Sequence, residues 1–247
     1  MNYKLGKLPA RKDVVKFKLS QYDIALPTPP KTFGHQKLVS SWGMLANDEV
    51  GDCVIAGGAH ETILWNQEAQ KSINFTDQSV LSDYSAITGY DPSDSSTDQG
   101  TDMQAAASYR RKTGLKDAQT NRHKVAAYIA VTPTNKTEMK QAIYLFSAVG
   151  LGIQFPASAM SQFNAGKNWT VVKSSKIEGG HYVPVIGYDT SYVYLVTWGK
   201  LIKATWGFVT KYADEALVYV SSEMLTGDKS LEGFNTAQLL ADLQALK

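Results

Sequence analysis

The hydrophobic pattern of the chain changes its period near residue 124, and this change limits the fold classes open to it. Before that point, apolar residues recur at helical spacing. The pattern predicts helices at 53–67, 77–84 and 102–112. After it, β-branched and aromatic runs alternate with turn residues. They predict strands at 124–131, 150–155, 181–188, 192–197, 205–210 and 216–220, around one helix at 135–146. A helical half followed by a sheet-rich half predicts an α+β fold.

The length and apolar content indicate one large folded unit. The chain has 247 residues, of which 43% are hydrophobic, enough to bury a core in one domain or in two closely joined lobes. We expect an extended, proline-bearing N-terminal arm at 1–36 that wraps the surface, a mainly helical lobe at 37–123, a β-rich lobe at 124–222 and a C-terminal helical tail at 223–247.

Charge and hydropathy exclude several classes of partner. The 25 Lys and Arg nearly balance the 23 Asp and Glu, and no basic patch emerges beyond residue 18, so no nucleic-acid partner is expected. The sequence holds no run of about 18 apolar residues, which predicts no membrane span. Segment 1–18 lacks the continuous apolar core of a secretion signal, so we expect the protein inside a cell.

The single cysteine, Cys53, lies where a loop turns into the first predicted helix. One thiol cannot form an intramolecular disulfide. The thiolate is the attacking species of cysteine chemistry, and a helix N-terminus stabilises its charge. Cys53 is therefore a candidate nucleophile if a base reaches it. The alternative is an inert buried thiol, since free cysteines are usually buried.

Of the four histidines, His181 is the best candidate base, because it follows two glycines on a predicted strand. His60 lies on the same helix face as Cys53, but two turns of helix separate them by about 10 Å, too far for proton transfer. His35 and His123 are expected in loops without an assigned role.

Several short segments, taken in order, resemble the landmarks of papain-like cysteine peptidases. They are Cys53 at a helix start, residues 75–80, residues 100–103 with 114–115, residues 179–188, and residues 197–199 followed by 206–207. The resemblance spans about residues 37–220. It implies a papain-like two-lobe fold, in which the Cys53 helix packs on an antiparallel sheet or barrel lobe that carries His181. It also implies the activity of a cysteine peptidase or related thiol hydrolase.

The pattern as a whole, including residues 5–7 and 42–48, also resembles uncharacterised papain-like proteins of tailed phages and prophages. This second resemblance implies a viral protein in the host cytoplasm or in a virion. A peptide or protein substrate and other virion proteins are the partners it implies. Neither resemblance implies a metal or an organic cofactor.

The family resemblance also implies roles for individual residues. Cys53 would be the nucleophile and His181 the general base and acid. The family's oxyanion donor is a glutamine six residues before the cysteine, a place that Asn47 holds here with the same amide on a shorter stem. The Asn that orients the imidazole in the family is absent. Alignment on Trp-Gly puts Val196 in its place, whereas spacing from His181 puts Thr197 there, and the two face opposite sides of a strand.

Three further residues are expected to line the cleft. Asp52 either raises the pKa of the neighbouring thiol or caps the helix that follows. Trp198 would cover the edge of His181, and Gly180 would flank it. Of Thr197 and Val196, only Thr197 can accept a hydrogen bond from the imidazole, so we take Thr197 as the orienting residue.

Two other functions stay open. The first is a catalytically inactive relative that serves as a structural or binding protein of a virus particle, which the missing Asn and the shorter amide favour. The second is a peptidoglycan-cleaving Cys/His amidase or endopeptidase, although the long separation of Cys53 from His181 favours papain-like dimensions. Whether the N-terminal arm occupies the cleft is left undecided.

Overall fold

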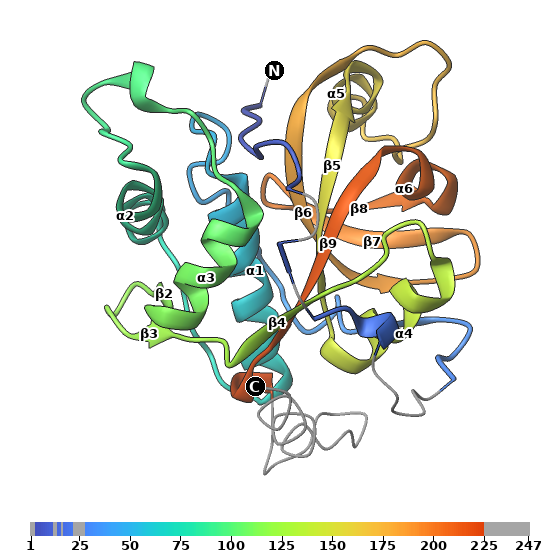
Figure 1. Cartoon of the computed structure of the whole chain (residues 1–247), viewed down its shortest axis with the longest axis horizontal. Coiled ribbons are helices and arrows are strands. Elements are labelled where there is room, and N and C mark those ends of the chain that lie inside the picture. Colours follow the sequence, from blue (N-terminus) through green and yellow to red (C-terminus); the bar gives the residue numbers. More distant parts are fainter. Residues whose placement is uncertain (1–2, 12–13, 16, 22–27, 225–247) are drawn as a thin grey trace.

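The computed structural model describes residues 3–11, 14–15, 17–21 and 28–224. Two lobes lie side by side, helical and sheet-rich, with the N-terminal arm running between them (Figure 1). The α+β organisation predicted from the change of period is confirmed. Of the helical tail predicted at 223–247, all but the first two residues lie outside the described part of the chain.

The helical lobe consists of three helices and a short hairpin. These are α1 (Cys53–Glu68), α2 (Asp77–Thr88), α3 (Met103–Lys112) and the paired strands β2 (Leu115–Lys116) and β3 (Arg122–His123). Side-chain caps mark where α2 and α3 begin. Thr76 and Ser79 form a reciprocal capping box, and Asp102 accepts the N–H groups of Gln104 and Ala105.

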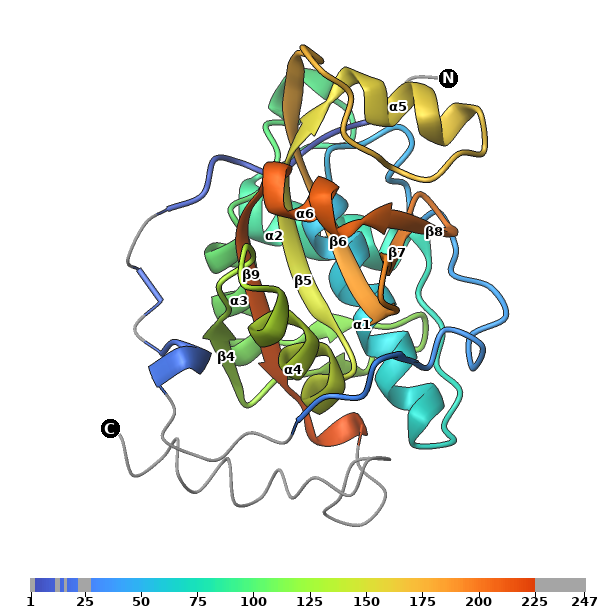
Figure 2. The same cartoon turned by 90° about the vertical axis from the view of Figure 1, so that its right-hand side faces the viewer.

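The second lobe is built on an antiparallel sheet. Its strands are β4 (Ala127–Ala130), β5 (Val149–Pro156), β6 (Ile177–Tyr188), β7 (Tyr192–Thr197), β8 (Lys200–Thr205) and β9 (Ala213–Val220). They pair in the order β4-β9-β5-β6-β7-β8, and β1 (Phe33–Gly34) pairs with β6. The helices α4 (Lys136–Phe146), α5 (Ala157–Asn164) and α6 (Trp206–Tyr212) lie on the side of the sheet away from α1 (Figure 2).

Helix α1 is the element that joins the lobes, and almost all of its residues are buried. It packs on β6, where a Cβ at Gly57 would lie 2.4 Å from the ring of Tyr182. Only glycine permits this approach, because any side chain would push helix and strand apart. The helix start and the histidine strand are thereby held close together.

One predicted strand is wrong. Residues 205–210 were expected to be extended, but helix α6 begins at Trp206 and the strand is β8, at 200–205. The hydroxyl of Thr205 accepts the N–H of Phe208, which caps the helix. The β-branched and aromatic residues that suggested a strand are instead the buried face of this short helix, since Phe208 and Val209 lie in the core. Helix α5 was not predicted.

Candidate active site

Cys53 is the first residue of α1 and is almost completely buried, with 1% of its surface exposed. The backbone N–H groups of Tyr182 and Gly6 hydrogen-bond to its sulfur. Burial outweighs these two donors and raises the pKa of the thiol to about 12. In this closed structure Cys53 is therefore a neutral thiol at physiological pH.

His181 lies on β6, next to the residue whose N–H reaches the sulfur, and is fully buried. Its Nε2 lies 2.7 Å from the hydroxyl of Thr197. Among the described residues its Nδ1 has no hydrogen-bond partner. When Nε2 carries the hydrogen and donates it to Thr197, Nδ1 keeps a free lone pair. Burial lowers the pKa of His181 to about 3, so the imidazole is neutral as well.

The turn after β7 places two of the expected residues on the imidazole. Thr197 contacts His181, whereas Val196 packs on the other side with Trp42 and Leu64. Trp198 has a positive φ of 46° and stacks on His181, with 4.4 Å between ring centroids and 16° between planes. A left-handed backbone is unfavourable for a tryptophan, so the fold maintains strain at this position.

Asn47 and Asp52 contact each other rather than the sulfur. The amide nitrogen of Asn47 donates to Oδ1 of Asp52 at 3.0 Å and to the carbonyl of Val50 at 3.2 Å. Both amide hydrogens are thus engaged in this state. Asp52 precedes α1, but its side chain makes no capping bond within the described part of the chain, so the capping alternative is wrong. Burial raises the pKa of the Asp52 carboxyl.

The N-terminal arm occupies the space between the lobes. The N–H of Lys7 donates to the carbonyl of Gly180, and the N–H of Leu8 donates to that of Thr101, both at 3.0 Å. The carbonyl of Gly6 accepts from Thr101 at 2.7 Å. Tyr3 stacks on Trp198. The arm is therefore not confined to the surface, and residues 3–8 cover both Cys53 and His181.

Three glycines make this crossing possible. A Cβ at Gly6 would lie 1.7 Å from the carbonyl oxygen of Gly51. Cβ atoms at Gly100 and Gly180 would lie 2.2 Å from the oxygen of Gly6 and 2.1 Å from that of Lys7. The sequence analysis left undecided whether the arm enters the cleft, although glycines beside each catalytic segment are a signal that a backbone passes close by.

Asp98 is a second residue that the sequence analysis did not single out. One carboxylate oxygen accepts the N–H of Gly51 at 2.9 Å, and the other accepts the hydroxyl of Tyr84 at 2.6 Å. That hydroxyl also accepts the N–H of Gly100. Asp98 thus links the loop before Cys53 to the loop that binds the arm. An Asp in a polar, Ser-rich segment is an ordinary turn residue, which hid this role.

Solved structures of cysteine proteases share the fold. Xylellain, a cysteine protease from Xylella fastidiosa, matches with a TM-score of 0.67 at 14% identity, over 90% of this chain and 98% of that chain. Procathepsin B S9 from Trypanosoma congolense matches with a TM-score of 0.65 at 10% identity, over 89% of this chain and 87% of that chain. The Carica candamarcensis cysteine protease CMS1MS2, solved with E-64, matches with a TM-score of 0.55 at 12% identity, over 78% and 99%.

Neither a protein-family model nor a curated protein matches the sequence. At this identity the likeness shows the fold alone, and the predicted papain-like two-lobe fold is confirmed. No helix in the described ranges has the length and apolar character needed to cross a membrane.

Proposed function

We propose that the protein is a papain-like cysteine peptidase whose closed form is latent. The observation that carries the proposal is the buried, unpartnered Nδ1 of His181, on an imidazole that Thr197 and Trp198 hold and beside the strand N–H that binds the Cys53 sulfur. An unpaired buried nitrogen costs free energy, so its presence on the residue before Tyr182, whose N–H reaches the thiol, favours a chemical role. The papain-like fold supports this reading.

The proposed reaction is acyl transfer through the thiol. Nδ1 of His181 takes the proton of Cys53, the thiolate attacks a peptide carbonyl, and the imidazolium returns the proton to the leaving amine, which leaves the acyl group on Cys53 as a thioester. Water, which gives a proton to the same imidazole, then hydrolyses the thioester and restores the thiol. The N–H of Cys53, in the first turn of α1, would donate to the oxyanion. Asn47 would join it only after releasing Asp52 or Val50. Thr197 orients the imidazole without adding charge, which predicts a slower enzyme than one with a carboxylate or amide partner.

The closed form is latent for two reasons. The arm fills the place where a substrate would lie, and it makes the site dry enough to keep thiol and imidazole neutral. Moreover, the N–H of Gly6 donates to the sulfur, so the arm engages the nucleophile directly.

The full-length Gly6→Ala variant tests this proposal, because a Cβ there cannot coexist with the carbonyl of Gly51. We expect iodoacetamide to alkylate Cys53 at least about tenfold faster than in the wild type, with a rate plateau below the ordinary thiol pKa of about 8.5. Hydrolysis of a fluorogenic peptide library should appear together with it. Gly207→Ala, which adds a methyl group where it meets no close neighbour, is the matched control.

The same variant separates the alternatives. An exposed thiol whose alkylation follows an ordinary pKa, with no peptide cleaved, would overturn the peptidase and favour an inactive binding protein. Cleavage of purified peptidoglycan but not of peptides would favour the amidase or endopeptidase. The phage or prophage origin, the virion partners and the location in host cytoplasm or virion stay predictions. Mass spectrometry of purified phage particles, to look for this protein and its neighbours, tests these three predictions.

A further inference from the structure

The ammonium group of Lys7 lies in an acidic pocket of the sheet-rich lobe. It is 3.0 Å from Oδ2 of Asp214 and 3.3 Å from Oε1 of Glu215, and its side chain is fully buried. It also donates to the carbonyl of Leu8 at 3.0 Å. A buried lysine needs such partners, because an unpaired charge away from water is very costly. The carboxylates come from β9 and the lysine from the arm, so the pair is made only when the arm is in place.

The absence of a side chain on β5 leaves room for this pocket. A Cβ at Gly152 would lie 2.2 Å from Cε of Lys7, 2.8 Å from Sδ of Met103 and 2.9 Å from Cγ of Glu215. The wall therefore consists of α3 on one side and of β5 and β9 on the other. Its lining is apolar along the lysine stem and acidic at the end, which suits a long basic side chain.

The arm lies in the cleft as a bound peptide would, with Lys7 as the side chain in this pocket. Backbone hydrogen bonds hold the arm on both sides, to Gly180 on β6 and to Thr101 before α3. The neighbouring residue, Gly6, faces the Cys53 sulfur. A substrate peptide that replaces the arm would bind the same two backbone segments. One of its side chains, close to the nucleophile, would then contact Asp214 and Glu215.

Lys7 does not satisfy every carboxylate oxygen in the pocket. Oδ1 of Asp214 is buried and accepts no hydrogen bond from any described residue. Oε1 of Glu215 is buried too, and its contact with the Lys7 ammonium is the ion pair at 3.3 Å. An ammonium offers three N–H donors from one nitrogen, one of which goes to Leu8, whereas a guanidinium offers five in a planar fork. The free oxygen of Asp214 and the long ion pair to Glu215 therefore favour arginine over lysine.

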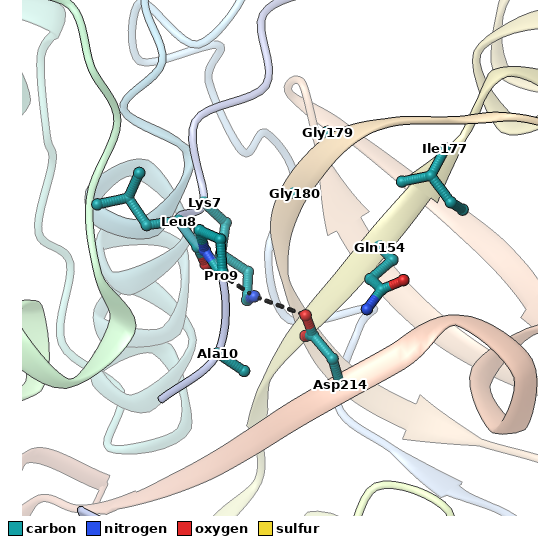
Figure 3. A pocket seen from close by; sticks show the side chains of 9 residues that line it. All are labelled: Lys7, Leu8, Pro9, Ala10, Gln154, Ile177, Gly179, Gly180 and Asp214. Atoms are coloured by element: carbon teal, nitrogen blue, oxygen red, sulfur yellow. Dashed lines mark hydrogen bonds and ion pairs between the residues drawn. The ribbon is translucent and has the colours of Figure 1, made fainter. Parts of the chain in front are cut away.

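A cavity of about 580 Å³ adjoins the arm at this point. Figure 3 shows Lys7 reaching from the arm to Asp214, with Gln154 of β5 and Ile177 of β6 beyond it. The cavity lies along Lys7–Ala10 and is bounded by Gly179 and Gly180. The cleft thus has room for an occupant larger than the arm.

We propose that Asp214 and Glu215 form a specificity pocket that binds an arginine or lysine side chain of a peptide substrate, with Lys7 as its occupant in the closed form. This inference rests on the proposed peptidase function. It deepens that function by naming the class of substrate, peptides with a basic residue close to the cleaved bond. The competing account is that the two carboxylates only fasten the arm.

The test uses full-length Gly6→Ala protein and synthetic peptides that differ at one position, which carries Arg, Lys, norleucine or Glu. Protection of Cys53 from iodoacetamide measures binding whether or not a peptide is cut. We expect Arg and Lys peptides to protect at concentrations at least about tenfold lower than norleucine, with Arg ahead of Lys and Glu weakest. Asp214→Asn with Glu215→Gln should abolish the preference, while Glu178→Gln, at an exposed carboxylate of the same lobe, should retain it.

The outcomes are distinguishable from failure of the proposed function. Basic peptides that protect but are not cleaved support the pocket and overturn the peptidase. Cleavage or protection without a preference for basic residues overturns the pocket and leaves the peptidase standing. Lys ahead of Arg overturns the preference for arginine that is argued from the free oxygen of Asp214 and the long ion pair to Glu215.

A second series of variants keeps the proposal testable if the double variant does not fold. In the otherwise unchanged chain, Lys7→Arg should keep Cys53 protected from alkylation, while Lys7→Met should expose it. Equal alkylation rates in these two variants would overturn recognition of a basic side chain.

Discussion

Two buried polar clusters lie along helix α1, and they are built in opposite ways. Glu61 accepts the hydroxyl of Tyr182 at 2.6 Å and a guanidinium N–H of Arg110 at 2.5 Å, and that guanidinium lies over the ring of Tyr219. On β6, next to the residue whose N–H reaches the Cys53 sulfur, the Nδ1 of His181 has no partner among the described residues.

Each cluster contains one of two neighbouring residues of strand β6. Tyr182 and His181 are adjacent on β6, so their side chains leave the strand on opposite sides. Tyr182 reaches Glu61 on α1, and His181 reaches Thr197 on β7. Burial is complete in both cases, but only the Glu61 cluster has its charges paired. Nε of Arg110 is also buried without a hydrogen-bond partner among the described residues, but its guanidinium is ion-paired with Glu61. The paired cluster joins the lobes, and the titratable Nδ1 of His181, which has neither kind of partner there, marks the place where chemistry is proposed.

The comparison predicts its largest effect at His181. His181→Ala in the Gly6→Ala background should lower kcat/KM by about 10²–10⁴-fold, the usual contribution of a general acid and base. It should also remove the low-pH plateau of Cys53 alkylation. Fluorogenic peptide hydrolysis measures the first effect and pH-dependent iodoacetamide labelling the second. Retention of the plateau would show that another group activates the thiol.

The paired cluster should respond in stability rather than in chemistry. Glu61→Leu leaves the guanidinium of Arg110 buried without its carboxylate and should lower the free energy of unfolding by about 3–5 kcal/mol. Urea denaturation measures this loss. Glu178→Gln, at an exposed position, is the control and should change it by less than about 0.5 kcal/mol. A loss for Glu61→Leu no larger than that of the control would contradict a joining role.

Thr197 should have an intermediate effect. Thr197→Val keeps the shape and removes the only hydroxyl bonded to Nε2 among the described residues. The lost bond is worth about 1–3 kcal/mol, or roughly tenfold to a hundredfold in kcat/KM in the Gly6→Ala background. Thr197→Ser, which keeps the hydroxyl, should retain most of the activity. If the valine and serine variants have the same rate and pH profile, Thr197 does not orient the imidazole.

The last prediction concerns the pH dependence of stability. Burial lowers the pKa of His181 to about 3 and that of His60 to about 4, below the usual value of about 6.5. Below pH 6.5 the unfolded chain binds these protons and the folded chain does not. Stability is therefore fully present above pH 6.5 and falls as the pH drops toward 4, by at most about 1.4 kcal/mol per pH unit for each histidine.

Urea denaturation at pH 7, 6 and 5 checks this dependence. The variant His181→Gln should have a shallower slope than the wild type, because one of the two buried histidines no longer titrates. An unchanged slope would mean that His181 binds its proton equally well in the folded and unfolded chains, contrary to its burial. Carboxyl groups, including Asp52 with its raised pKa, are the same in both proteins and contribute equally to the two slopes.

Local signals predicted much of the fold. Helix α1 was expected at 53–67 and spans Cys53–Glu68, and β7 was expected and found at 192–197. Periodicity and turn residues act over a few positions, which is why they locate such elements. They failed at 205–210, where a cap on Thr205 and burial against the sheet turned a β-branched run into helix α6.

The site was predictable only in part. The positions of Cys53 at a helix start and His181 on a strand follow from local pattern. The choice between Thr197 and Val196 does not, because one residue of register exchanges the faces of a strand and sequence spacing supported both. Nor could the sequence reveal that Asn47 donates to Asp52, since each has several turn-like partners within reach.

By itself, the sequence determined the order of the lobes and the start of the cysteine helix, because spacing and turn chemistry are local. The tertiary structure decided which groups share a buried space. It placed Thr197 on the imidazole, the arm over the thiol and Lys7 against Asp214 and Glu215. It also decided that Cys53 and His181 are neutral, because burial, more than residue type, sets the pKa of a group removed from water.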